Sequence, residues 1–199
     1  MWDQRYSEGS FAYGDQPNGF LVEQVGALKP GTCLCLAEGQ GRNAIWLAQQ
    51  GFSVTAMDQS PVGMTRAREL AAERGVTIDT QVGDLSDFDL GDSRWDTIVS
   101  IFGHLPSGLR RSVHRRVVRA LKPGGVFLLE AYTPEQLAMP GTGGPSDADM
   151  LLTVETLRSE TEGLEFIIAR EIHREVNEGD YHHGMSAVVQ IVARKPIEG

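Results

Sequence analysis

Over about 110 residues, short apolar runs alternate with helical segments, and this alternation constrains the fold most strongly. Parallel strands cannot be joined by tight turns, so strand–helix alternation predicts a parallel sheet covered on both faces. We expect strands at Thr32–Ala37, Ser53–Met57, Val76–Val82, Trp95–Phe102 and Val126–Tyr132, and helices at Arg42–Gln50, Pro61–Arg74 and Leu109–Leu121. Ser60 is the predicted N-cap of the second helix, with Pro61 at its first helical position.

The pattern changes after residue 132. We expect a long Gly/Pro-rich loop at Thr133–Met150, a helix at Leu151–Glu162, and two strands at Leu164–Val176 and His182–Ala193 that form a hairpin. The prediction is one α/β domain with a seven-stranded, mostly parallel sheet and a C-terminal antiparallel hairpin. Its expected parts are an N-terminal cap and helix (1–30), a ligand-binding core (31–132), a lid loop and helix (133–163) and the closing hairpin (164–195).

The charge of the chain limits its partners. The 199 residues carry a formal net charge of −9, of which −3 belongs to residues 1–144 and −6 to residues 145–199. Such an acidic chain is a poor partner for nucleic acid or an anionic membrane. Cys33 and Cys35 are expected to be buried thiols of a reducing compartment, and no apolar leader or membrane span is recognisable, so we expect a cytoplasmic location. The arginines of Leu109–Leu121 are expected on one exposed helix face.

A glycine-rich turn after the first strand is the most informative motif. Gly39 and Gly41 lie between the first strand and the first helix, where the backbone can approach an anionic ligand closely. Asp58 ends the second strand and Asp84 follows the third, so both carboxylates should lie at the carboxyl edge of the sheet. A turn or cap role is the alternative for each aspartate. Together these features predict a ligand that contains adenosine.

At these residues the sequence resembles the class I S-adenosylmethionine-dependent methyltransferases, most of all the tellurite-resistance-type and thiopurine-methyltransferase-like enzymes. The resemblance extends to Leu121-Lys122-Pro123-Gly124-Gly125, to the closing hairpin and to an N-terminal pattern around Trp2–Tyr6 and Tyr13-Gly14. It implies a Rossmann-like fold, S-adenosylmethionine as cofactor and S-adenosylhomocysteine as product. The chain departs from the family at Cys35, where many members have an acid, and at Ala37, where many have glycine.

The resemblance also implies roles for individual residues. The segment from Glu38 to Asn43 would hold the methionine end of the cofactor, Asp58 the ribose, and Asp84 with the Leu85 amide the adenine. Ser100 to Phe102 would flank the sulfonium. The full cofactor-binding prediction comprises Arg5, Tyr13, Ala37, Glu38, Gly39, Gly41, Asn43, Asp58, Gln59, Asp84, Leu85, Ser100 and Phe102.

Three residues are candidates for the chemistry. His104 follows the fourth strand, next to the expected methyl position, and is either a base or a packing histidine. His173 and Arg174 match a pair linked to the acceptor site in the tellurite-resistance-type enzymes, although adjacent strand residues point to opposite faces. A metal site at His182 and His183 is rejected, and no metal is expected.

The predicted function is methyl transfer from S-adenosylmethionine to a small molecule, by a monomer or homodimer. The absence of an Asn-Pro-Pro-Tyr-type motif disfavours nucleobase methylation, and the family likeness favours a thiol or a tellurium or selenium oxyanion. An NAD-dependent oxidoreductase is the first alternative, because the glycine-rich loop and Asp58 also fit a dinucleotide. A non-catalytic sensor that binds S-adenosylmethionine is the second.

Overall fold

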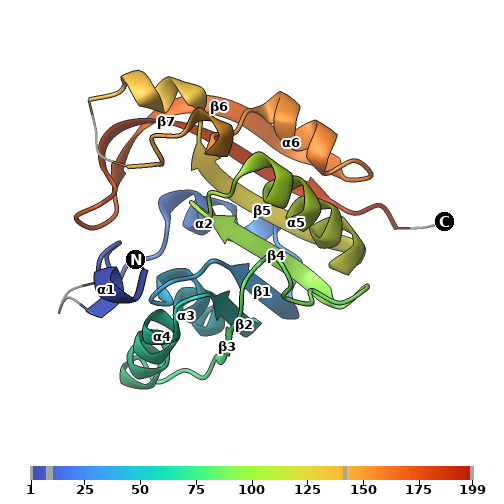
Figure 1. Cartoon of the computed structure of the whole chain (residues 1–199). Helices are drawn as coiled ribbons and strands as arrows, with labels where there is room; N and C mark the ends of the chain where they lie inside the picture. The colour runs from blue at the N-terminus through green and yellow to red at the C-terminus, as the bar shows by residue number, and fades with distance from the viewer. Residues whose placement is uncertain (1, 8–10, 141–142, 198–199) are drawn as a thin grey trace.

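The computed structural model describes residues 2–7, 11–140 and 143–197. Within them, seven strands form one sheet in the order β3-β2-β1-β4-β5-β7-β6 (Figure 1). The strands are β1 (Thr32–Leu36), β2 (Ser53–Asp58), β3 (Asp79–Val82), β4 (Trp95–Ile101), β5 (Leu121–Tyr132), β6 (Glu165–Asn177) and β7 (His183–Arg194). The helices are α1 (Trp2–Ser7), α2 (Gly19–Gln24), α3 (Arg42–Gln49), α4 (Pro61–Glu73), α5 (Ser107–Ala120) and α6 (Val154–Glu160), with 3-10 turns η1 (Val25–Ala27), η2 (Pro134–Ala138) and η3 (Ala148–Met150).

The pairing of the strands confirms the expected mixed sheet. β1 to β5 pair in parallel, whereas β7 pairs antiparallel with both β5 and β6. β1 lies between β2 and β4, so the order of the strands reverses beside it. In open α/β sheets, ligands bind outside the carboxyl ends of the strands at such a point. The topology therefore places the glycine-rich turn after β1 at the expected ligand edge.

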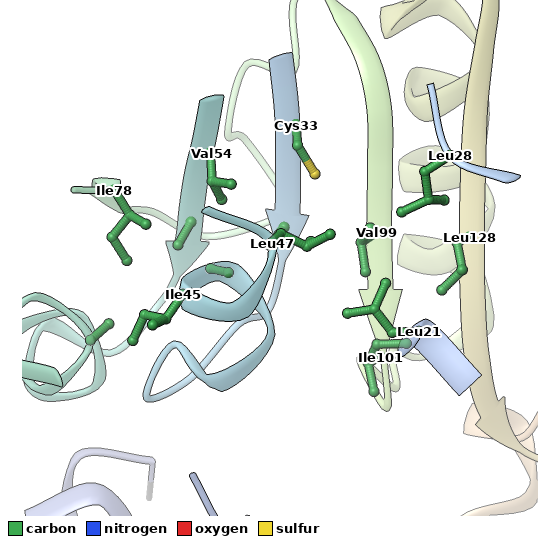
Figure 2. Packing of buried hydrophobic residues seen from close by; sticks show 14 of the residues in the cluster. Leu21, Leu28, Cys33, Ile45, Leu47, Val54, Ile78, Val99, Ile101 and Leu128 are labelled. Carbon is green, nitrogen blue, oxygen red and sulfur yellow. The ribbon is translucent and has the colours of Figure 1, made fainter. Parts of the chain in front are cut away.

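Helices cover both faces of the sheet. One apolar cluster joins side chains of α2, α3 and α4 to one face, and Cys33 and Cys35 both lie in it as free thiols. Figure 2 shows Leu47 of α3 against β1, the strand that carries Cys33, with Val99 and Leu128 further along the sheet. A second cluster joins α5 and α6 to the opposite face, through residues such as Val117. The near-continuous burial of β4 follows, because a parallel strand covered on both faces meets no water.

Several element boundaries differ from the sequence predictions. β3 is four residues long, because Val76–Ile78 leads into the sheet without pairing. β5 begins at Leu121, so the Lys-Pro-Gly-Gly turn lies within the strand as a register shift opposite Trp95. Ser60 is confirmed as the N-cap of α4, since its side chain accepts a hydrogen bond from the Gly63 amide at 3.0 Å.

The arginines of α5 do not form one exposed face as expected. Arg110 is buried and donates to both carboxylate oxygens of Glu160 on α6, at 3.1 and 3.2 Å. Arg116 is half-buried and donates to the Phe88 carbonyl at 2.8 Å. These two arginines tie α5 to its neighbours, and the others of the row remain exposed. No helix in the described ranges is long and apolar enough to cross a bilayer.

Candidate functional site

The turn between β1 and α3 is held in a left-handed backbone conformation. Ala37, Gly39 and Gly41 have φ angles of 50°, 62° and 89°. A Cβ on Gly41 would lie 2.6 Å from the Cβ of Ala67 in α4, so the close approach of α3 to α4 requires glycine there. Ala37 adopts a conformation that side chains disfavour, which accounts for the frequent glycine at its position in the family it resembles. The amides of Glu38, Gly39 and Gly41 fix this conformation, because they donate to the Met57 carbonyl at 3.0 Å, the Asp58 carboxylate at 2.9 Å and the Glu38 carbonyl at 3.3 Å.

Asp58 at the end of β2 is buried and holds two loops together. Its oxygens accept hydrogen bonds from the amides of Gly39 and Ser60, both at 2.9 Å. Burial is the main cause of the raised pKa of Asp58, and these two amide contacts oppose it. A carboxylate can accept about four hydrogen bonds, so acceptor capacity remains for the hydroxyls of a ligand.

Glu38 caps the start of α3 from within the same turn. One of its carboxylate oxygens accepts from the amides of Asn43 and Ala44, at 2.9 and 2.8 Å. Burial raises the pKa of Glu38 to about 7, and the two amides and Arg42 oppose this shift. Its second oxygen forms no hydrogen bond among the described residues. Asn43 uses its own side-chain oxygen to accept from the Asn18 amide at 2.9 Å, and this bond fixes the N-terminal segment on α3.

The carboxyl ends of β2 and β3 meet through the backbone. The Gly83 amide donates to the Asp58 carbonyl at 3.0 Å, which places Asp84 at the same sheet edge. Asp84 is exposed, and its side chain accepts from the Ser86 amide at 2.8 Å, a contact that lowers its pKa. Leu85 is buried, whereas Gln59 is exposed directly after Asp58. Asp84 therefore stabilises a turn, as in the alternative to ligand binding, and its carboxylate is also exposed to solvent.

The end of β4 lies against the glycine-rich turn. A Cβ on Gly103 would meet the Ser100 hydroxyl at 3.1 Å and the Ala37 Cβ at 3.4 Å, so these three residues converge. Phe102 has a φ of 54°, a conformation that a bulky side chain adopts only where the surrounding structure enforces it. The ends of β1 and β4 thus approach each other where the sequence predicts the reactive end of the ligand.

Both ring nitrogens of His104 contact backbone groups. Its Nδ1 contacts the Phe102 carbonyl at 3.1 Å and its Nε2 accepts from the Tyr132 amide at 3.0 Å. Burial lowers the pKa of His104 to about 4. A neutral ring with both nitrogens in use supports the packing alternative, in which His104 positions the segments around Phe102.

Helix α1 covers this edge of the sheet. The ring of Tyr6 lies between Gly39 and Gly63, and Asp3 hydrogen-bonds the Ser60 hydroxyl. Arg5 donates to the Tyr13 hydroxyl at 2.7 Å and lies 4.5 Å above the ring of Tyr181. The predicted residues Arg5 and Tyr13 are therefore brought together, and both lie next to the turn between β6 and β7 (Figure 1).

The structure separates His173 from Arg174. His173 is exposed on β6 and contacts Glu135 at 2.7 Å. Arg174 instead forms two hydrogen bonds of 2.7 Å with the buried Glu130 and one of 3.0 Å with Glu178. The opposite orientation expected for adjacent strand residues holds here, and the two side chains do not share one site.

A buried polar network next to the site is not indicated by any sequence motif. Asn18 donates to Glu130 and Glu178 at 2.6 and 2.8 Å, and Arg42 donates to Glu178 at 2.6 Å. The Asn18–Glu178 contact spans 160 residues of sequence, so no local pattern could have predicted it. The network fixes the N-terminal segment and α3 to the hairpin turn. No group of three or more metal-ligating side chains occurs in the part of the chain that the structure describes.

Comparison with known proteins gives a family match over this region. Residues 33–125 match the family described as a methyltransferase domain. A 2-heptyl-1-hydroxyquinolin-4(1H)-one methyltransferase of Mycobacteroides abscessus is 33% identical over 97 residues, which cover 47% of this chain and 43% of that protein. An uncharacterized methyltransferase of Bacillus subtilis, YbaJ, is 31% identical over 51% of this chain and 40% of its own length. The chain thus spans less than half the length of these curated relatives.

Solved structures show the same fold over the whole chain. A structure from work on the conversion of a disulfide bond into a thioacetal group during echinomycin biosynthesis has a TM-score of 0.79 at 20% identity, covering 100% of this chain and 91% of that one. TehB from Haemophilus influenzae has a TM-score of 0.73 at 20% identity, covering 98% of this chain and 65% of its own. At these identities the likeness concerns the fold alone.

Proposed function

The chain carries a methyltransferase domain within the class I S-adenosylmethionine-dependent methyltransferase fold, and from that premise we propose that it transfers a methyl group from S-adenosylmethionine to a small-molecule acceptor. The observation that carries the proposal is the buried Asp58 carboxylate beside the Gly39 amide, at the point where the strand order reverses. The family match at 33–125 includes both residues.

The residues present fit this cofactor. We propose that Asp58 accepts hydrogen bonds from the ribose hydroxyls, and that the second oxygen of Glu38 binds the methionine ammonium in place of the acid missing at Cys35. Asp84 and the Leu85 amide would contact the adenine from the exposed loop after β3. The remaining predicted contacts come from Arg5, Tyr13, Ala37, Gly41, Asn43, Gln59, Ser100 and Phe102. The bound cofactor supplies an electrophilic methyl group, so the protein chiefly aligns the acceptor and excludes water.

We propose that the acceptor reacts through sulfur or oxygen. A thiol needs no strong base, which agrees with a His104 whose nitrogens are both in use. A tellurium or selenium oxyanion receives less support, because Glu130 and Glu178 already neutralise Arg174, the expected anion-binding cation. The relative that methylates a hydroxyquinolinone supports an organic small molecule. Helix α1 and loop 133–150 would close over this acceptor.

Thermal shift with S-adenosylmethionine, S-adenosylhomocysteine and NAD tests the proposal, followed by turnover of a thiol acceptor. A ligand at 100 times its Kd stabilises a protein by about 2.7 kcal/mol, so a clear shift is expected with both adenosyl ligands. No shift with either at millimolar concentration would overturn the proposal. A shift with NAD alone would indicate the oxidoreductase, and adenosyl binding without turnover on any acceptor would indicate the sensor.

A further inference from the structure

Two buried polar atoms lack a hydrogen-bond partner among the described residues, and they belong to the same cluster. They are the hydroxyl of Tyr132 and Nδ1 of His182. The two side chains are 0% and 8% exposed, and their rings lie 5.4 Å apart at an angle of 85°. The Ser186 hydroxyl lies close enough to the Tyr132 hydroxyl to oppose the rise in its pKa, but the two do not meet hydrogen-bond geometry, and Ser186 donates to the Gly184 carbonyl at 3.1 Å. Buried polar groups are nearly always satisfied, so these two neighbouring atoms need a partner that the described chain does not supply, such as a water molecule or a ligand.

Aromatic rings surround the two atoms. Phe102 stacks on Tyr132 with ring centroids 4.6 Å apart, and the edge of His182 meets Phe102 at 4.5 Å. Tyr13 lies 4.5 Å from His182 on the other side. We call these four residues the aromatic cluster. Phe102 follows the end of β4, so the cluster adjoins the convergence of β1 and β4 where the methyl group is expected.

Two segments cover the aromatic cluster. Arg5 of α1 binds the hydroxyl of Tyr13 and lies over Tyr181, at the turn shown beside α1 in Figure 1. From the other side, a Cβ on Gly144 would lie 2.8 Å from the Tyr132 ring, so the chain there packs directly on that ring. The cluster is therefore enclosed by parts of the N-terminal segment and of loop 133–150.

The charges around His182 select against a cationic ligand. Burial is the main cause of its strongly lowered pKa, and the charges of Arg42, Arg5 and Arg174, together with His104, lower that pKa further. The carboxylates beside Tyr132, Glu130 and Glu178, are committed to Arg174 and Arg42. His182 thus presents a neutral ring nitrogen in surroundings with a cationic bias, which suits a neutral hydroxyl better than an amine.

We propose that the aromatic cluster is the acceptor subsite, and that it takes a flat aromatic molecule whose hydroxyl is oriented by Nδ1 of His182 and the hydroxyl of Tyr132. This inference rests on the proposed methyltransferase function and narrows its acceptor class. Stacking and edge contacts with Phe102 and Tyr13 favour a planar ring. A site built to hydrogen-bond a hydroxyl discriminates strongly against an analogue that lacks one, because the orphan groups then stay unpaired.

Equilibrium titration with three probes tests this subsite on the protein saturated with S-adenosylhomocysteine. The probes are 1-naphthol, naphthalene without the hydroxyl, and decahydro-1-naphthol without the flat ring. We expect 1-naphthol to bind at least tenfold more tightly than either analogue. Equal affinity for 1-naphthol and naphthalene would overturn the proposal. Failure of S-adenosylhomocysteine to bind in the first place would contradict the methyltransferase function instead.

Variants assign the preference to the two side chains. His182→Ala and Tyr132→Phe should each weaken 1-naphthol binding about tenfold and leave S-adenosylhomocysteine affinity unchanged, which also shows that the variant is folded. Tyr132→Phe removes only the hydroxyl, so it keeps the test decisive if His182→Ala does not fold. His183→Ala changes the exposed neighbouring histidine and should keep the wild-type affinity. Wild-type affinity for 1-naphthol in both His182→Ala and Tyr132→Phe would refute the assignment.

Discussion

Arg174 and Glu130 form a two-pronged ion pair: Nε and Nη2 of the guanidinium donate to separate carboxylate oxygens, each at 2.7 Å. Glu130 is fully buried on β5, and Asn18 and Gln190 donate to it as well. The ion pair therefore ties β6 to β5, across the intervening strand β7. Arg174 therefore stabilises the fold, although the family resemblance implies that it binds the acceptor.

Arg174→Met should destabilise the protein without a specific loss of acceptor binding. Removing one partner of a buried pair leaves Glu130 without its main cation, which costs about 3 kcal/mol or more. Urea unfolding measures the loss. Arg170→Met on the same strand is the control, because Arg170 is 39% exposed and its loss should cost less than about 1 kcal/mol. A stable Arg174→Met protein with abolished turnover would restore a direct catalytic role.

Asp58→Asn should weaken S-adenosylhomocysteine binding at least tenfold, about 1.4 kcal/mol. The amide would direct its NH₂ group toward the Gly39 or Ser60 amide, and it offers ribose hydroxyls fewer acceptors. Calorimetric titration measures the Kd. Asp79→Asn on the adjacent strand is a matched control, since Asp79 is exposed and its side chain accepts from Gln81. Unchanged affinity in Asp58→Asn would refute the ribose assignment.

Gly41→Ala should destabilise the protein more than Gly51→Ala. Both glycines have a left-handed φ, of 89° and 92°, so both substitutions introduce similar backbone strain of about 1 kcal/mol. Only at Gly41 does the new Cβ meet another atom, the Ala67 Cβ at 2.6 Å, whereas nothing lies within 4 Å at Gly51. We expect an additional loss of about 1–3 kcal/mol at Gly41 from overpacking, read from urea unfolding. Equal losses in the two variants would show that α3 and α4 can separate freely.

Cofactor affinity should rise with pH through the titration of Glu38. The pKa of Glu38 is about 7 in the folded protein, against an ordinary value of 4.5. Between these values the folded protein holds a proton that the unfolded chain has lost. Protonation of Glu38 therefore stabilises the folded protein. This stabilisation is fully present below pH 4.5 and is lost as the pH rises through about 7.

Only the ionised carboxylate pairs with an ammonium group, so S-adenosylhomocysteine should bind up to about tenfold more tightly at pH 8 than at pH 6. Titration at several pH values measures this slope. Glu38→Gln should bind weakly with a flatter profile, since its side chain does not ionise. Glu38→Asp is the control, because it keeps a carboxylate and should keep a pH-dependent affinity. A slope that persists unchanged in Glu38→Gln would assign the titration to another group.

Much of the architecture could be predicted because its signals are local. The run of apolar residues at β4, the Ser60 cap and the Gly39–Gly41 turn each depend on neighbours in sequence, and all three appear where expected. The predicted boundaries of β3 and β5 were wrong, since strand pairing and the register shift opposite Trp95 depend on the adjacent strand.

The candidate site could be predicted from the sequence less well than the fold. His104, His173 and Arg174 are candidates by residue type and position, but a side chain's availability depends on which groups already bind it. The Phe102 carbonyl, Glu135 and Glu130 respectively hold them in the folded protein. The sequence offers only a rejected metal-ligand role for His182, because its isolation from polar partners exists only after the hairpin packs on Phe102.

The sequence alone determined the class of sheet, the glycine-rich turn and the carboxylate at the end of β2, because periodicity and spacing place such groups at one edge of a parallel sheet. Tertiary structure alone decided which titratable groups are neutralised and which are left unpaired. Contacts such as Asn18 with Glu178 join residues 160 positions apart, and the burial that shifts each pKa arises only when those distant segments pack together.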